Sequence, residues 1–458
     1  MITGWTRWAI ALAIAALVAS AATPSFAAGD SSAAVQRLGP PEIEARREAL
    51  LKQMIARPND LDLAFEYATL SSQAGDYEAA ISTLERMLIY APNTPRLQLE
   101  LGVLYYRLGA YDVARSYFEQ ALANPNLPPS IAEQVHLYLQ QLALAADPPP
   151  FSATIFSAIR WESNANSGPG TGSVTLNGIN FTLNQQAVGQ AGWSALNIGT
   201  MHYTYDMKNQ GDRIEFDALA YSTAYFENEL QNISLDFFEG TLGPSFNMKR
   251  WGMDKTRAFI YAIGDLAYLG YDPYFTAPGA GLRLLSFAFE RSVLDARLET
   301  RVREFTNTSN LPTNTLRDGA QTRLGATYSY YLTPALVLTT QGYGQREDAR
   351  AGFYADWEFA FSGGFAWTFN NPVWNGKYPW TLQVGGGAIH RDYDDPDPTI
   401  NPKVAETDRV FWTQAALVLP VAETWSLVPQ VEYRDQESNY DIRAFTDLTA
   451  LLGVQKRF

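Results

Sequence analysis

The sequence predicts a multidomain protein, with an N-terminal all-α solenoid of helical repeats followed by a C-terminal transmembrane antiparallel β-barrel of about 14 strands. Three observations support this fold class. Apolar residues recur at helical spacing up to residue 146, and from Phe151 they alternate with polar residues, as in β-strands. Charged residues make up only 18% of the chain, against roughly 25% in soluble proteins. Aromatic residues reach 13%.

Composition excludes several kinds of function. The 458-residue chain has no cysteine, which excludes disulfides, thiolate nucleophiles and zinc sites built from cysteine. Its three histidines, His136, His202 and His390, are too few for most metal or acid–base sites. A formal net charge of -14 argues against nucleic-acid binding, because proteins bind the phosphate backbone with cationic side chains. We therefore expect no enzyme activity, no nucleic-acid partner, no cofactor and no metal ion.

Residues 1–27 have the pattern of a secretory signal peptide. Arg7 is the only charged residue, an apolar run follows it, and Ser25-Phe26-Ala27 supplies the small residues that signal peptidase recognises. We expect cleavage between Ala27 and Ala28. The alternative is a membrane anchor, which would need about 20 consecutive apolar residues, and this run is shorter.

Residues 61–126 contain an internal repeat with a period of 34 residues. Small residues, a turn glycine and prolines that end helices recur in the matched pairs Ala68/Gly102, Gly75/Gly109, Tyr77/Tyr111, Ala80/Ala114, Met87/Ala121 and Pro58/Pro92. The period and the residue types resemble tetratricopeptide repeats, in which each unit is a pair of helices. We expect a half-unit at 42–57, a capping helix at about 129–145, and a repeat domain over 28–146.

In the tetratricopeptide family, the first helix of each unit lines a groove for extended peptides, and the resemblance assigns a client-binding groove to ten residues. They are Asp62, Phe65, Thr69, Ser72, Gln73, Arg96, Leu99, Val103, Tyr106 and Arg107. The alternative is a spacer whose groove faces water. After the repeats, residues 147–150 (Asp-Pro-Pro-Pro) predict a stiff hinge, since consecutive prolines favour extended polyproline II.

Residues 151–458 predict the barrel. Segments 213–220, 294–303 and 447–458 place apolar residues on one face and polar residues on the other. One such strand would also suit a soluble sandwich, but a series of them behind a secretory signal predicts an outer-membrane barrel. Fourteen strands are expected, beginning near residues 152, 195, 212, 233, 256, 280, 292, 320, 335, 353, 379, 408, 425 and 443. Totals of twelve and sixteen stay open, because short strands are hard to bound.

Loop lengths indicate the orientation of the barrel. If the first strand leaves the periplasm, the long polar connections 162–193, 307–318 and 392–407 are extracellular. The tight turns near residues 290–291, 332–334 and 420–422 are then periplasmic. An even strand number also returns the C-terminus to the periplasmic side. We therefore expect a protein of the cell outer membrane, with its repeat domain in the periplasm.

Aromatic side chains are expected where strands cross the membrane interfaces, because amphipathic rings favour that boundary. The candidates are Trp161, Trp193, Trp251, Trp367, Trp374, Trp380, Trp412 and Trp425. Phe458 ends the last alternating strand. In this the chain resembles outer-membrane proteins, which present a C-terminal aromatic residue to the barrel-assembly machinery. We therefore predict that Phe458 is an assembly signal.

Three polar features have both a functional and a structural interpretation. The acidic loop 392–397 offers carboxylates to calcium, but it lacks the glycine and distal Glu of an EF-hand, so we favour a solvated loop. His202 and His390 would suit a surface lipase with a serine nucleophile, but no Gly-x-Ser-x-Gly turn accompanies them. The charged face at 295–303 mixes both signs, so we expect ion pairs across the barrel wall rather than a selective pore.

The order of signal peptide, short repeat array, Pro-rich hinge and barrel resembles the surface lipoprotein assembly modulator family. The stretches that carry the likeness are 101–111 with 118–122, 127–129, 161–166 and the related 437–440. The resemblance implies periplasmic repeats that engage a client lipoprotein or secreted protein, and a fourteen-stranded barrel in outer-membrane lipid that provides its exit. Two alternatives stay open: an exopolysaccharide export porin, although such proteins usually carry longer repeat arrays, and a passive porin. The Ser-Asn pairs at 163–164 and 438–439 have no assigned role.

Overall fold

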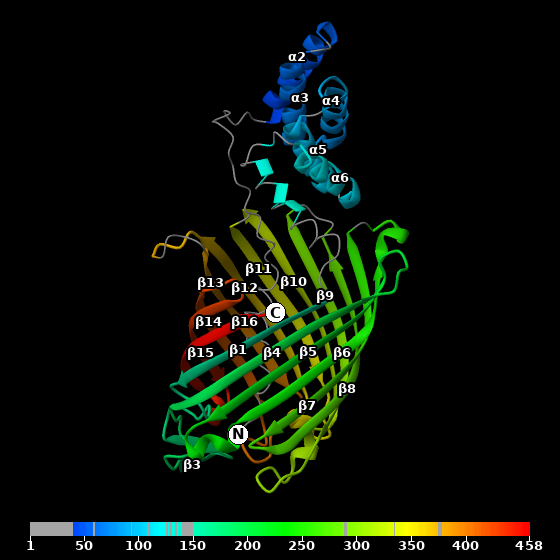
Figure 1. Ribbon diagram of the computed structural model, residues 1–458. Coiled ribbons are helices and arrows are strands. Elements are labelled where there is room, and N and C mark those ends of the chain that lie inside the picture. Colours follow the sequence, from blue (N-terminus) through cyan, green and yellow to red (C-terminus); the bar gives the residue numbers. More distant parts are fainter. Residues whose placement is uncertain are drawn as a thin grey trace. The chain divides into compact units, whose positions relative to one another are not determined.

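The computed structural model forms two compact units, one within Ala28–Pro149 and one that contains Pro150–Phe458 (Figure 1). The structure describes residues 40–57, 60–92, 94–107, 110–124, 127, 131–132, 135–136, 138–139, 150–253, 255–287, 291–333, 335–373 and 378–458. The expected signal peptide with its Ala27/Ala28 cleavage site lies outside the described residues, as do positions 147–149 of the hinge. Among the described helices, none combines the length and the apolar character needed to cross a membrane.

The first unit consists of paired helices. They are α2 (Pro40–Ala56), α3 (Leu61–Gln73), α4 (Tyr77–Tyr90), α5 (Pro95–Arg107) and α6 (Tyr111–Leu122). Asp60 and Asp76 cap α3 and α4, because their carboxylates accept hydrogen bonds from the free backbone N–H groups of Leu63 and Ala79. Gly75 has φ +81°, which suits the turn between these two helices. The expected half-unit is present as α2.

Small residues let the helices of this unit pack closely. Ala68 and Ala80 are buried in a cluster with Leu84 and Leu101. A Cβ atom at Gly102 would lie 2.4 Å from the ring of Phe118, which is fully buried. Residues 131–132, 135–136 and 138–139 are helical, and Val135 packs in the same cluster as Phe118. The remaining residues of the expected capping helix at 129–145 lie outside the described residues.

The second unit is a closed antiparallel barrel of fourteen strands, so the predicted fold class and strand number are confirmed. The strands are β1 (Phe151–Glu162), β4 (Gly192–Asp206), β5 (Arg213–Tyr225), β6 (Leu235–Asn247), β7 (Thr256–Leu269), β8 (Asp272–Ser286), β9 (Ser292–Phe305), β10 (Gly319–Thr333), β11 (Leu336–Glu347), β12 (Asp356–Phe369), β13 (Trp380–Tyr393), β14 (Thr407–Pro420), β15 (Trp425–Ser438) and β16 (Phe445–Arg457). β1 pairs with β16 to close the ring, and the hairpin of β2 (Ser173–Leu176) with β3 (Ile179–Thr182) is separate from it.

Alternation assigns the two faces of each strand. In β16, Leu448 and Leu452 are exposed on the outside, whereas Asp447 and Gln455 are buried on the inside. The same holds for β9, where Leu298 and Val302 face outward and Arg301 and Arg303 face inward. An outward apolar surface with polar residues inside is the arrangement of transmembrane barrels.

Two expectations about the strands are corrected. β8 begins at Asp272 rather than near residue 280, and it follows β7 after the tight turn Gly270-Tyr271. This turn lies on the side where the other connections are longer, such as 163–191, 306–318 and 394–406. Trp412 faces the lumen, because it packs with buried Ile389 and Val410, and is therefore not an interface residue. Trp374 lies outside the described residues.

Candidate functional site: the repeat groove and the barrel lumen

The predicted groove residues occupy three kinds of position on α3 and α5. Asp62, Thr69, Gln73 and Arg96 are exposed. Phe65, Ser72, Val103 and Tyr106 are half-buried. Leu99 is buried in the core with Ala114, Phe118, Ala121 and Val135, which removes it from any surface that a client could touch. The side chain of Arg107 lies outside the described part of the structure. Client binding by these residues stays a prediction.

Phe65 and Arg96 are the groove residues that the structure brings together. The guanidinium carbon of Arg96 lies 4.7 Å from the centroid of the Phe65 ring, a cation–π contact between the first helices of successive units. Phe65 also packs, partly buried, against the core of the first repeat. Tyr106 is held similarly, with its ring 6.3 Å from that of Tyr138.

A second polar cluster in the repeats did not emerge from the sequence. The hydroxyls of Tyr105 and Tyr117 donate hydrogen bonds to Glu85 Oε1 at 2.7 and 3.3 Å, and the two rings stack at 5.6 Å. The hydrogen bond to the Glu85 carboxylate, together with burial, raises the pKa of Tyr105 to about 12. These bonds join α4, α5 and α6, so the cluster fixes the orientation of successive units.

α2 is fastened to the first complete unit by Arg47. Its guanidinium donates to Ser71 Oγ at 3.1 Å and to Glu44 at 2.8 Å, and it forms a short ion pair with Asp76. Asp76 is also the N-cap of α4, and its bond from Ala79, with the contact to Arg47, lowers its pKa. The half-unit is therefore held at the α3–α4 turn.

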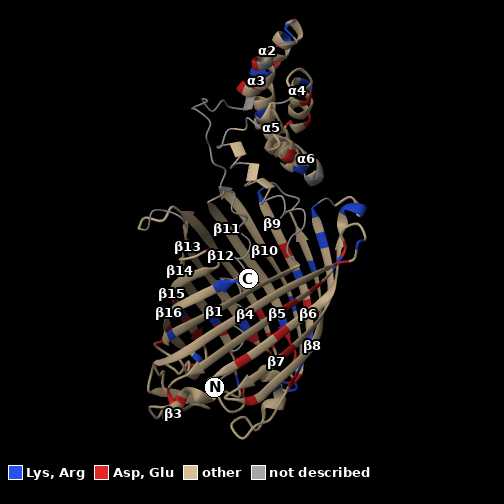
Figure 2. Ribbon diagram, in the orientation of Figure 1, with Lys and Arg blue, Asp and Glu red and all other residues tan. Residues whose placement is uncertain are grey.

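Arginines and carboxylates pair on the lumen side of the barrel wall, as the mixed charges at 295–303 predicted. Figure 2 shows that residues of both signs occur along the strands of the barrel. Arg301 contacts Glu239, Asp265 and Glu299 at 2.8–2.9 Å, so one guanidinium joins β6, β7 and β9. Arg303 pairs with Glu347 of β11 at 2.8 Å. Because these arginines and carboxylates neutralise one another, this face carries no electrostatic potential of a single sign.

Two further buried networks complete the inner polar surface. On β12–β14, Arg391 lies 2.5 Å from Glu358, 3.6 Å from Asp408 and 4.0 Å from Asp356. On β1, Arg160 pairs with Glu162 at 2.9 Å. Each of these inward arginines therefore has at least one carboxylate partner.

The Ser-Asn pairs hold loops to strands. Ser163 Oγ donates to Asp447 Oδ1 at 3.0 Å and accepts a 2.7 Å bond from the Leu448 backbone, which ties the first loop to β16. The backbone N–H of Asn164 donates a hydrogen bond to the same Asp447 Oδ1 at 2.8 Å. Asn439 holds the end of connection 394–406, because its side chain accepts a hydrogen bond from the Thr407 N–H and donates one to the Ala405 carbonyl. These bonds give the motif a structural role.

The acidic loop and two of the three histidines make close polar contacts. Asp394 pairs with Arg346, which lowers the pKa of Asp394, and Asp392 lies 2.9 Å from His390 Nε2. His202 Nδ1 lies 2.6 Å from Asp217. Within the part of the chain that the structure describes, no three His, Asp or Glu side chains gather as metal ligands would.

Comparisons with known proteins support the repeat domain. Residues 70–143 match the family model of the tetratricopeptide repeat, which confirms that prediction for this segment. Among curated proteins, none matches the chain. The resemblance to the lipoprotein assembly modulator family gains no confirmation beyond the repeats and the barrel.

Solved structures resemble parts of the chain at low similarity. The Yersinia enterocolitica type III secretion chaperone SycD, in complex with a peptide of the translocator YopD, is 15% identical, with a TM-score of 0.22 over 23% of this chain and 84% of its own. MamA is 14% identical, with a TM-score of 0.21 over 23% of this chain and 62% of its own. A bacterial polysaccharide outer membrane secretin is 10% identical, with a TM-score of 0.35 over 67% of this chain and 98% of its own. At these values, the likenesses do not decide function.

Proposed function

We propose that this protein is an outer-membrane barrel whose repeat domain lies in the periplasm and assists the translocation or surface display of a client protein. The observation that carries the proposal is the union, in one chain, of a tetratricopeptide-repeat module with anchored aromatic groove residues and a closed barrel with an apolar outside. The resemblance noted above favours a lipoprotein as the client.

The outer surface of the barrel supports the location. Ile155 and Ile159 of β1 and Leu324 of β10 are 49–62% exposed on the outside, where a soluble protein would place polar residues. Closure satisfies every strand edge, which hydrocarbon requires because it offers no hydrogen-bonding partners. The partners that follow are outer-membrane lipid and the machinery that assembles barrels, with Phe458 as its signal.

The groove supports a polypeptide client over a passive solute. Phe65 and Tyr106 are partly buried rings that can contact apolar side chains, and Arg96 is an exposed cation that can attract acidic ones. A passive porin needs no such surface. Contacts of a client with a partly buried ring and with an exposed guanidinium would contribute together about 1–3 kcal/mol, or roughly 5- to 150-fold in affinity.

The test combines Phe65→Ala with Arg96→Ala in one variant. It measures the surface labelling of a lipoprotein encoded by an adjacent gene, normalised to the amount of folded barrel. We expect a loss of at least about fivefold. Ile89→Ala is the matched control, since Ile89 is 77% exposed on α4 and outside the groove. Undiminished labelling after deletion of 42–146, with the barrel still folded, would make the repeats a spacer.

A further inference from the structure

A cationic platform lies at one end of the barrel, where two neighbouring connections meet. Turn 207–212 joins β4 to β5, and connection 248–255 joins β6 to β7. We define the platform by its exposed cations and aromatic rings, which are Lys208, Lys249, Arg250, Lys255, Tyr205 and Trp251. Figure 2 shows Lys and Arg at this end of the barrel. The two connections contain four cationic residues and two carboxylates, in a chain whose formal net charge is -14.

Hydrogen bonds hold the two connections together. Asp212 is buried, and its carboxylate accepts a hydrogen bond from the Asn247 N–H at 2.9 Å and forms an ion pair with Arg250. Asn247 also accepts a hydrogen bond from the Lys249 N–H at 3.1 Å. The guanidinium carbon of Arg250 lies 4.7 Å from the centroid of the Trp251 ring. The platform is therefore a fixed part of the barrel rim, and Arg250 helps to position Trp251.

The three lysines of the platform differ from Arg250 in their contacts. Lys208, Lys249 and Lys255 are exposed, and the residues that the structure describes give them no ion pair. Asp254, the second carboxylate of the two connections, lies outside those residues. The charges of the three lysines are thus not used within the described fold, and they are available to an anion from outside the chain.

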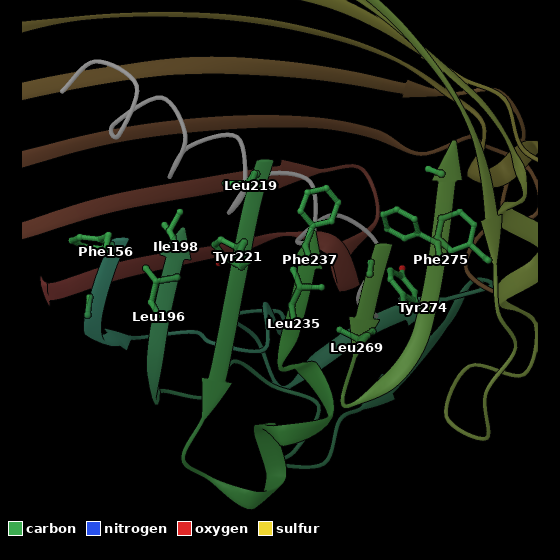
Figure 3. Packing of buried hydrophobic residues seen from close by; sticks show 14 of the residues in the cluster. Phe156, Leu196, Ile198, Leu219, Tyr221, Leu235, Phe237, Leu269, Tyr274 and Phe275 are labelled. Carbon is green, nitrogen blue, oxygen red and sulfur yellow. The ribbon is translucent and has the colours of Figure 1, made fainter. Parts of the chain in front are cut away.

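The strands that carry the platform separate an inner face from an outer one. On the inner face, Leu219 and Phe237 belong to a buried apolar cluster (Figure 3). On the outer face, Leu242 of β6 and Ile260 of β7 are each 54% exposed. Under the proposed membrane location, hydrocarbon covers this outer apolar band. The platform follows the band at the ends of the same strands.

This position selects the kind of anion. Tyr205 and Trp251 are each 58% exposed, and amphipathic rings at the end of an apolar band favour the membrane interface. The interface is the depth of the lipid headgroups. Basic residues next to a membrane are attracted to anionic lipids. The phosphate groups of lipids are therefore the anions closest to the three lysines.

The opposite end of the barrel has a different charge. Connection 394–406 contains four carboxylates and one lysine, and connection 163–191 contains no charged residue. If charges at the rim served only to solvate the connections, either sign would suit both ends. The excess of cations at the platform is instead a local feature of one end.

We propose that the platform binds the headgroups of anionic phospholipids, with its lysines at the phosphate oxygens and with Tyr205 and Trp251 at the boundary between headgroups and acyl chains. This inference rests on the membrane location in the proposed function and goes beyond it by naming a lipid class and the strands that it contacts. Phosphatidylglycerol and cardiolipin fit, because they carry net negative charge. Phosphatidylcholine fits less well, since the lysines repel its choline group.

The test measures lipid contact at Trp251 in the full-length protein. The protein is reconstituted in phosphatidylcholine bilayers that contain a rising fraction of brominated phosphatidylglycerol or of brominated phosphatidylcholine, because bromine quenches tryptophan emission on contact. The difference from Trp251→Phe isolates the share of Trp251 in the quenching. A separate arm adds soluble glycerol 3-phosphate, which distinguishes a lipid headgroup from a free phosphate.

We expect the association constant for phosphatidylglycerol to exceed that for phosphatidylcholine at least about fivefold. A variant that combines Lys208→Gln, Lys249→Gln and Lys255→Gln should reduce this preference to less than about twofold. Glycerol 3-phosphate should leave the preference unchanged.

The matched control removes three exposed cations elsewhere and should keep the lipid preference; its changes are Lys52→Gln, Arg350→Gln and Lys403→Gln. Equal association of the two lipids, no quenching of Trp251 by either, or a preference that survives in the platform variant would overturn the proposal. Loss of the preference in the control would make it a net-charge effect, and competition by glycerol 3-phosphate would make the platform a site for free phosphate; both outcomes also overturn it. The measurement involves neither a client nor the groove, so its failure and failure of the groove test are distinguishable.

Discussion

Replacement of Arg391 by Met should destabilise the barrel strongly. The Arg391 side chain is only 4% exposed and is the shared partner of Glu358, Asp408 and Asp356, all within 4.0 Å. Met has a similar volume, so the main loss is electrostatic: buried carboxylates remain without their cation. Removing one partner of a buried ion pair costs about 3–5 kcal/mol. We therefore expect the folding equilibrium to shift by a factor of at least about 100.

The assay is urea unfolding of the barrel in detergent, followed as loss of the folded band on unheated gels. Arg350→Met is the matched control, because Arg350 is 65% exposed in its pair with Asp318 and should contribute less than about 1 kcal/mol. Adding Glu358→Gln to Arg391→Met should recover part of the loss, since one unbalanced carboxylate is removed. If Arg391→Met unfolds at the same urea concentration as Arg350→Met, the network does not stabilise the barrel.

Three further predictions concern the loops, the C-terminus and the orientation. Burial raises the pKa of Glu406 to about 7, so its contribution to stability is present below the ordinary pKa of 4.5 and is lost as pH rises through 7. Glu406→Gln should therefore flatten the pH dependence of the urea midpoint between about pH 5 and pH 8, and an unchanged slope would refute this. Deleting Phe458 removes its backbone bonds to Ala153 at the β1–β16 seam and should lower folded yield on gels, whereas full yield would make it dispensable. Tags near Gly168 and Pro396 should bind antibody on intact cells and a tag near Pro334 should not, and labelling at Pro334 would reverse the orientation.

The barrel was predictable because alternation is a local signal. β7, β9 and β15 begin at Thr256, Ser292 and Trp425, the positions expected from the period of two. β8 was misplaced because Pro273 and Pro278 indicate a break, since proline lacks the donor that a strand interior needs. The structure accommodates Pro278 opposite Gly264, and the turn before β8 is unusually tight. A local rule about proline is thus overridden by the pairing of neighbouring strands.

The functional surfaces were harder to predict, because they depend on contacts between segments. Helical spacing places Leu99 on the same face as Arg96 and Val103, but α6 and the helical residues near Val135 cover Leu99 and leave Arg96 exposed. Trp412 is of a residue type that is common at membrane interfaces. It lies two positions after buried Val410 on β14, however, so both side chains point inward.

Under the proposed function, the seam between β1 and β16 bears on the route that a client would take through this barrel. The register runs unbroken from Thr154/Arg457 to Glu162/Thr449, and both ends are fastened further. Phe458 and Ala153 exchange backbone bonds at one end, and Ser163 joins Asp447 and Leu448 at the other. Each ladder bond contributes about 0.5–1.5 kcal/mol in water, and breaking one in hydrocarbon costs more because no solvent replaces it. Lateral opening would have to break the ladder and both fastenings together, whereas passage along the lumen breaks none of them. Under the proposed function, a client would therefore pass along the lumen rather than through the seam.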